Sequence, residues 1–300
     1  MNILEILSPE ELKKVTEKNN FLASLTILSD WFIIIATFAL MSLYTNPLTI
    51  LIGTFILGGR QLGLGIVVHE TGHRTLFSSK NLNDFVGNWL AGYWVFSDKD
   101  TYIKGHLNHH REAGTKDDPD LSNYQNYPIT YKSLKRKITR DLTGQVGWRR
   151  IKSIASATAR FSSLNSKMQQ YLLRSYGVNL GMLIIMTLFG APWLFLCWLV
   201  AFMTSHMFVV RVRQIAEHAA VPDLFDSDAR KNTRTLYISW LERLLIAPHG
   251  VNYHMEHHIL ASVPIYRLAL MHRILLAKGY YSDIKFQTGY FNLLKQVVQA

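Results

Sequence analysis

Residues 31–59 read WFIIIATFALMSLYTNPLTILIGTFILGG, a run that contains no Asp, Glu, Lys or Arg. A second uncharged run covers residues 175–210. Each run is long enough to cross a bilayer core of roughly 30 Å. Each also carries turn and helix-breaking residues near its middle, namely Tyr44-Thr45-Asn46-Pro47 and Gly190-Ala191-Pro192. Each run therefore predicts a hairpin of two membrane helices.

We expect four membrane spans, at about residues 24–44, 48–68, 175–190 and 193–212. Neither hairpin turn holds a charged residue, whereas almost every Lys and Arg lies outside the two hairpins. Because basic residues favour the cytoplasmic side of a membrane, the charged side is predicted to be cytoplasmic. A soluble protein with two very apolar core helices is the alternative.

The basic charge is concentrated between Tyr131 and Arg174. Eleven Lys or Arg lie there against one acid, Asp141, so the segment carries 11 − 1 = +10 of a formal net charge of +11. A basic surface helix beside a membrane span is attracted to anionic headgroups by roughly 1 kcal/mol per residue. This interpretation is favoured over a docking face for a phosphate-bearing or acidic partner, and nucleic acid is the weakest alternative.

Cys197 is the only cysteine and lies in the fourth predicted span, which excludes disulfides and thiolate metal sites. The N-terminal residues lack the order of a signal peptide, so the first span is expected to be retained. Any metal must therefore be bound by histidine.

Eight of the twelve histidines fall into three boxes, HETGH at 69–73, HLNHH at 106–110 and HMEHH at 254–258. His69 and His73 are four residues apart, so on a helix they share one face and suit one metal ion. The later boxes, with His106, His109 and His110 and with His254, His257 and His258, place an adjacent pair that can splay toward two ions.

The number of ligands indicates two metal ions. Imidazole suits Zn, Cu, Fe and Ni, so the ligand type alone does not name the metal. A catalytic zinc needs three protein ligands and a structural zinc needs four, and eight imidazoles exceed both. The boxes are also expected to meet at one membrane surface, where ionisable residues usually mark a functional path.

The remaining histidines differ in their context. His218 follows the fourth span on an expected helical extension and is the best candidate for a further ligand, with an ordinary surface histidine as the alternative. His206 lies within a span and His272 in a C-terminal helix, where packing is favoured over ligation. His249 either supports the metal ligands or lies on the surface.

A ligating imidazole needs an acceptor for its other ring N–H. Seven carboxylates flank the boxes, and the sequence does not decide which of them act: Glu70, Glu112, Asp117, Asp118, Asp120, Glu217 and Glu256. Residues 117–120 fit a turn with helix-capping acids equally well. Arg60 and Gln61 are polar exceptions inside the second span, and we favour a cavity below the metals over snorkelling toward the headgroups.

The three boxes resemble the pattern HxxxH or HxxxxH, HxxHH, HxxHH of the membrane fatty acid desaturase and hydroxylase superfamily, over about residues 65–264. The resemblance implies one all-α integral membrane domain over residues 1–300, in which residues 69–174 and 213–300 form a cytoplasmic helical cap on four membrane helices. It implies a di-iron centre, O₂ as co-substrate and a bacterial plasma membrane location. It also implies His218 as a ninth ligand, with Gln214 one turn before it.

The same resemblance implies an acyl chain in a bent tunnel below the metals. Two roles are open for Trp89, Tyr93 and Trp94, which are to line this tunnel or only to anchor the cap. Front-end desaturases have Gln at the first position of the third box, where this chain has His254, so the resemblance does not extend to that subclass. No His-Pro-Gly-Gly haem motif is present, so electrons are expected from a separate ferredoxin, rubredoxin or cytochrome. The residues after the third box, Ile259-Leu260-Ala261-Ser262, differ from the Leu-Phe-Pro sequence that more commonly follows this box in the superfamily.

The expected reaction is oxygen-dependent desaturation of a lipid or acyl-thioester chain, with hydroxylation as the alternative within the superfamily. From another class, His69-Glu70-x-x-His73 matches the HExxH motif of a membrane zinc metalloprotease with Glu70 as general base. That alternative explains only the first box. A metal carrier is a third and weaker alternative, because its ligands should cross the bilayer.

Overall fold

Four apolar helical segments of the computed structural model, which describes residues 3–299, are long enough to cross a membrane. The first consists of α2 and α3, and the last consists of α10 and α11, which follow each other with a break at Thr204. The segments comprise α2 (Pro9–Thr16), α3 (Asn20–Leu43), α4 (Pro47–Gly72), α9 (Ser166–Leu188), α10 (Trp193–Met203) and α11 (Ser205–His218).

Short polar signals set the helix ends in the first apolar run. The Asn19 side chain accepts a hydrogen bond from Leu22 N and begins α3, while the Asn46 side chain accepts from Leu48 N and Thr49 N and begins α4. Pro47 occupies the first position of α4, where its missing N–H costs nothing. The residues that interrupt the hydropathy pattern are therefore the residues that separate the two helices.

The prediction of four apolar helical segments long enough to span a membrane is confirmed, with differences at the boundaries. Helix α9 begins at Ser166, nine residues before the expected 175, because Asn165 caps it and its polar first turns continue the same helix. Helix α4 continues to Gly72, so the first histidine box lies in its last turns, with His73 as the C-cap of the helix. An apolar run locates the membrane part of a helix, whereas capping decides where the helix starts.

The rest of the described chain is made of short helices and two minimal strand pairs, which confirms the all-α fold class. β1 (Ile129–Thr130) pairs in parallel with β4 (Val298–Gln299), and β2 (Leu236–Tyr237) with β3 (Gln287–Thr288). The other elements are α1 (Ile3–Ile6), α5 (Lys80–Phe85), η1 (Val86–Ala91), η2 (Gly92–Val95), α6 (Lys99–Glu112), η3 (Leu121–Asn123), α7 (Tyr131–Leu142), α8 (Gln145–Ala159), η4 (Phe161–Ser163), α12 (Ala229–Asn232), α13 (Trp240–Leu245), η5 (Pro248–Gly250), α14 (His254–Ile259), α15 (Ile265–Ala277) and α16 (Tyr290–Gln296).

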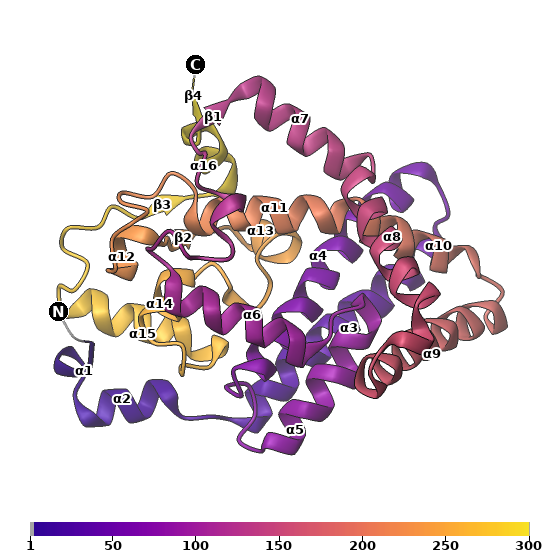
Figure 1. Ribbon diagram of the computed structural model, residues 1–300, viewed down its shortest axis with the longest axis horizontal. Coiled ribbons are helices and arrows are strands. Elements are labelled where there is room, and N and C mark those ends of the chain that lie inside the picture. Colours follow the sequence, from indigo (N-terminus) through magenta and orange to yellow (C-terminus); the bar gives the residue numbers. More distant parts are fainter. Residues whose placement is uncertain (1–2, 300) are drawn as a thin grey trace.

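The longest apolar helices lie toward one end of the molecule, and several short helices lie toward the other. Figure 1 shows α3, α4, α9 and α10 toward one end, whereas α2, α12, α14 and α15 lie toward the other. Helix α4 packs against α3, α6, α10 and α11, and it is the most buried of the four membrane segments. The last turns of α4 are therefore held between the membrane helices and the short helices.

Glycines on α4 let its neighbours approach closely. A Cβ added at Gly63 would lie 2.5 Å from the Asp30 carboxylate on α3, and one at Gly59 would lie 2.5 Å from the Leu245 carbonyl. Small residues at helix contacts are the usual means of close packing inside a membrane, where apolar burial gives little driving force.

Arg60 lies within this close contact. Its guanidinium forms a buried ion pair with Asp30 at 3.1 Å and also donates to the Leu244 carbonyl. Arg60 therefore neither lines a cavity nor snorkels, and both interpretations offered from the sequence are wrong for this residue. The reason is a buried acid on the neighbouring helix, 30 residues away in the chain.

Candidate metal centre

Nine histidines from four helices form two groups in which the ligand nitrogens lie within 4.8 Å of one another. The first group contains His69, His73, His106, His110 and His257, and the second contains His109, His218, His254 and His258. These are the eight box histidines and the predicted ninth. The structure therefore brings together every residue expected to bind metal.

The helical positions decide which group each histidine joins. His69 and His73 end α4 and fall in the same group, as their four-residue spacing suggests. On α6 the adjacent His109 and His110 point into different groups, and on α14 His257 and His258 do the same. Adjacent residues on a helix project about 100° apart, so one short helix reaches both groups.

Ring nitrogens within each group lie at very short distances from each other. The Nε2 atoms of His69 and His106 are 2.7 Å apart. The Nε2 atom of His110 lies 2.9 Å from Nε2 of His106 and 2.9 Å from Nε2 of His257. In the second group, Nε2 of His254 lies 2.9 Å from Nε2 of His218.

The opposite ring nitrogen often has an acceptor, which sets the tautomer. The Nδ1–H of His69 donates to Glu70 at 2.9 Å, that of His109 to Asp118 at 2.8 Å, and that of His218 to the Asn232 carbonyl at 3.2 Å. Nδ1 of His254 lies 3.4 Å from Glu217. With the proton on Nδ1, each Nε2 presents a lone pair to its group, which is the form that binds a metal ion.

Two further observations fit the groups to metal ions. Among the described residues, Nε2 of His73 and Nε2 of His258 are buried without a hydrogen-bond partner. Burial lowers the pKa of His110 to about 3 and holds the pKa of His257 well below its usual value, so both rings are neutral near pH 7. Converging neutral imidazoles with unpaired nitrogens fit two transition-metal ions. Without a bound ion, the buried nitrogens that lack a hydrogen-bond partner would destabilise the fold.

The carboxylates near the boxes separate into three roles. Glu70, Asp118 and Glu217 contact the rings of ligand candidates, as described above. Asp118 also accepts from the Tyr124 hydroxyl and from Asp120 N at 2.8 Å, so the acidic run both forms a turn and orients a histidine. Glu256 contacts none of the nine rings, whereas Glu112 pairs with Arg111 on the surface.

Glu256 holds the C-terminal region to the third box. It accepts hydrogen bonds from His272 Nδ1 at 2.6 Å, from the Tyr281 hydroxyl at 2.7 Å and from Thr235. His272 therefore has the packing role expected for it. The His249 side chain is 6% exposed and bonded to Asp30 at 2.7 Å, so it is neither on the surface nor in contact with a ligand candidate.

The metalloprotease alternative has no support in this geometry. The Glu70 carboxylate is occupied by His69, by the Thr75 hydroxyl at 3.0 Å and by Ile265 N at 3.0 Å. His69 and His73 also share their group with three histidines from the other boxes. Glu70 thus positions a ring and a loop and does not face a site for water.

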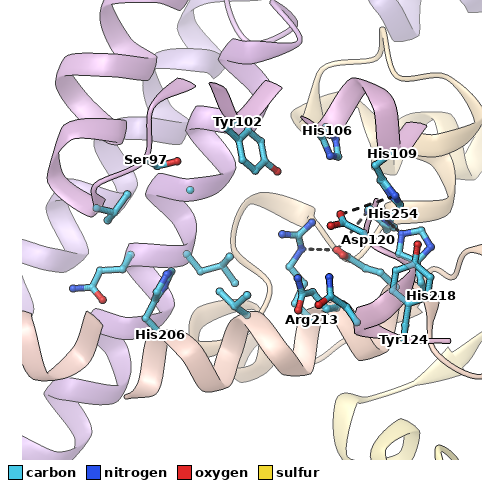
Figure 2. A pocket seen from close by; sticks show the side chains of 18 of the residues that line it. Ser97, Tyr102, His106, His109, Asp120, Tyr124, His206, Arg213, His218 and His254 are labelled. Atoms are coloured by element: carbon cyan, nitrogen blue, oxygen red, sulfur yellow. Dashed lines mark hydrogen bonds and ion pairs between the residues drawn. The ribbon is translucent and has the colours of Figure 1, made fainter. Parts of the chain in front are cut away.

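A cavity of about 280 Å³ adjoins the second group and runs between α4 and α11. Figure 2 shows His109, His218 and His254 on one side of it and His206 and Ser97 on the other, with Tyr102 and Arg213 between them. Gln61 lines this cavity as predicted, and so does His206, for which packing was favoured. Trp89, Tyr93 and Trp94 do not line it, so of the two roles offered for them, lining a tunnel or anchoring the cap, the first does not apply to this cavity.

The sequence did not point to several residues around this cavity. Tyr102 lies one turn before His106 on α6, a spacing that could have revealed it. Tyr124, whose ring stacks on His218 with centroids 4.8 Å apart, comes from a loop and has no local signal. Arg150 reaches the cavity from α8, and in the sequence it is one of many basic residues.

Comparisons with known proteins agree with this arrangement. The family model for fatty acid desaturases matches residues 45–290, a wider range than the motifs alone covered. The dihydrorhizobitoxine desaturase of Bradyrhizobium elkanii is 25% identical over 302 residues, which cover 90% of this chain and 80% of the relative. The β-carotene ketolase of a Paracoccus species is 28% identical over 217 residues, which cover 69% and 73% of the two chains.

Proposed function

The chain belongs to the fatty acid desaturase family, and from this membership we propose that it is a di-iron desaturase that uses O₂. The observation that carries the proposal is the division of nine histidines, six of them buried, into two groups with converging lone pairs. Five histidines would hold one ion and four the other, the second with more room for a further ligand. When bound, the two irons supply the oxidation of an unactivated C–H bond.

The protein's own residues hold and orient this centre. Glu70, Asp118 and Glu217 keep the ring protons of their histidines on Nδ1, so that Nε2 stays free for a metal ion. The cavity beside the second group positions a substrate carbon at that group and limits access of water.

The proposed reaction removes two hydrogens from neighbouring carbons and forms a C=C bond. With two electrons and two protons from a donor, O₂ is reduced to two molecules of water, which balances the reaction. We expect the electrons from a separate ferredoxin, rubredoxin or cytochrome. Hydroxylation of one carbon is the alternative, since the relatives include a ketolase as well as a desaturase.

We further propose that the two histidine groups face the cytoplasm at a bacterial plasma membrane. The charge pattern supports this placement, because the turn between α3 and α4 and the turn between α9 and α10 carry no charged residue. The expected substrate is an alkyl chain of a lipid or an acyl thioester, as the family suggests, and no nucleic acid partner is expected.

The test combines metal analysis with product analysis. The full chain, purified in detergent, should contain two iron ions, and a host that expresses it should accumulate a compound that lacks two hydrogens. His257→Ala should lose iron and product. Asn108→Ala, an exposed neighbour within the second box, should keep both. Fewer than two irons in the intact chain, or an unchanged product in His257→Ala, would contradict the proposal, and a product with one added oxygen would favour hydroxylation.

A further inference from the structure

The cavity beside the second histidine group is built from one face of each of two helices. Gln61 and Gly65 line it from α4, and His206, Val210 and Gln214 line it from α11. On α11, twelve residues separate His206 from His218, both of which line the cavity, and this corresponds to about 18 Å along the helix. The cavity is therefore long enough to hold a chain of several carbons between its two ends.

The end away from the histidine groups is polar, and we call the part lined by Gln61, Arg150 and His206 the polar end. Nε2 of Gln61 donates to the Trp198 carbonyl at 2.9 Å, whereas its Oε1 has no partner among the described residues. Nδ1 of His206 likewise has none. Both side chains are almost completely buried, at 0% and 5% exposure. Buried polar atoms without a partner are rare in folded proteins and indicate a missing hydrogen-bonding group. At Gln61 Oε1 that group must be a donor, whereas Nδ1 of His206 donates to an acceptor in one of its tautomers.

Arg150 adds a positive charge at the same end. Its guanidinium lies over the Phe202 ring at 4.8 Å, and that ring stacks on His206 with centroids 5.6 Å apart. Nη2 donates to the Val95 and Phe96 carbonyls at 3.1 and 3.4 Å, just before Ser97. Burial lowers the pKa of Arg150, so its charge is poorly solvated.

The charge of Arg150 has no counter-charge of its own. Arg213, the other arginine in this cavity, pairs with Glu217. Within residues 3–299, no carboxylate lies within ion-pair distance of Arg150. An arginine whose partners are only carbonyls and an aromatic ring keeps an uncompensated charge that attracts an anion, and its planar guanidinium matches a carboxylate.

We propose that Arg150 and the Nδ1–H of His206 at the polar end bind the carboxylate of a compact substrate, so that the alkyl part of the substrate extends toward the second histidine group, while Gln61 Oε1 accepts from a separate donor such as water. This assignment rests on the proposed function and specifies its substrate class, a small alkyl carboxylate. A plain hydrocarbon tail at this end would cover Arg150, Gln61 and His206 without any hydrogen bond. The volume of about 280 Å³ also suits a small molecule better than a long acyl chain.

A binding experiment with three short probes tests this assignment. The full chain, purified in detergent and analysed for iron, is titrated with hexanoate, hexan-1-ol and hexylamine, and the thermal unfolding midpoint is followed. Hexanoate should raise the midpoint in a saturable way, whereas the alcohol and the amine should not at equal concentration. The three probes share one alkyl chain, so a difference among them reports the head group.

Variants locate the binding site. Arg150→Gln should weaken hexanoate binding at least tenfold, and Arg150→Lys should recover part of the loss. Arg149→Gln, an exposed neighbour on the same helix, should bind hexanoate as the native chain does. Gly65→Leu serves as a second blocking variant, because a Cβ at Gly65 meets no atom within 4 Å and the longer side chain would enter the cavity.

The assignment is overturned if the three probes act alike or if none binds. It is also overturned if Arg150→Gln and Gly65→Leu both bind hexanoate as tightly as the native chain does. Failure of the proposed function is a different result. A chain that binds hexanoate through Arg150 but holds no iron would retain the anion site and lose the di-iron assignment. A chain with two irons and no hexanoate binding would do the reverse.

Discussion

Asp30 on the first membrane helix is hydrogen-bonded to His249, whose Nε2 lies 2.7 Å from its carboxylate, five residues before the third histidine box. Arg60 on α4 completes the cluster through its ion pair with Asp30. His249 has a left-handed backbone conformation, with φ of 61°. The bonds therefore hold a strained turn against the membrane helices.

Replacing Asp30 with Ala should destabilise the fold strongly. The change leaves the Arg60 guanidinium buried without its carboxylate, which costs about 3–5 kcal/mol in comparable buried pairs. Thermal and denaturant unfolding in detergent measure this loss. Asp30→Ala combined with Arg60→Met should recover part of it, because no buried charge is left unpaired. Equal stability of the single and the double variant would show that the unpaired Arg60 charge is not the cause of the loss in stability.

Asp118→Asn should weaken metal binding in the second histidine group by about 10–100-fold, because Asp118 orients His109 and sets its tautomer. Iron retained during titration with a chelator measures the effect, and one of the two ions should be lost first. Asp117→Asn is the matched control, since Asp117 is exposed and contacts none of the nine histidines. If both variants release iron like the native chain, the role assigned to Asp118 is wrong.

Tyr281→Phe should lower the free energy of unfolding by about 1–3 kcal/mol, because it removes one donor to the buried Glu256 carboxylate. The iron content should stay at two ions, since Glu256 contacts no ligand candidate. Tyr280→Phe provides the comparison, because its hydroxyl makes no hydrogen bond to any described residue. Equal losses of stability in the two variants would contradict the assigned bond.

Single-cysteine labelling should report the sidedness of the membrane helices. The native chain has one cysteine, Cys197, which is buried. A membrane-impermeant maleimide should label Thr45→Cys, between α3 and α4, only from outside intact cells. It should label Lys116→Cys, beside the second box, only after the cells are opened. Labelling of both cysteines from the same side would refute the predicted orientation.

Much of the fold and the ligand set could be predicted because the signals are local. A span is visible as an apolar run, and ligands on a short helix are visible as offsets of three and four residues. The boundaries of α9 and the break at Thr204 were not visible, since capping and packing set them. The Asp30 cluster was also missed, because 219 residues separate Asp30 from His249.

The sequence by itself determined an all-helical chain with four membrane-length segments and eight histidines in metal-binding spacing, because helix length and periodicity depend on neighbouring residues. Only the tertiary structure decided which histidines share a group, which carboxylates orient them, and that Arg60 pairs with Asp30 while Arg150 enters the cavity unpaired. Those choices depend on side chains from distant segments that the close packing around α4 brings within hydrogen-bond range, and no local pattern encodes them.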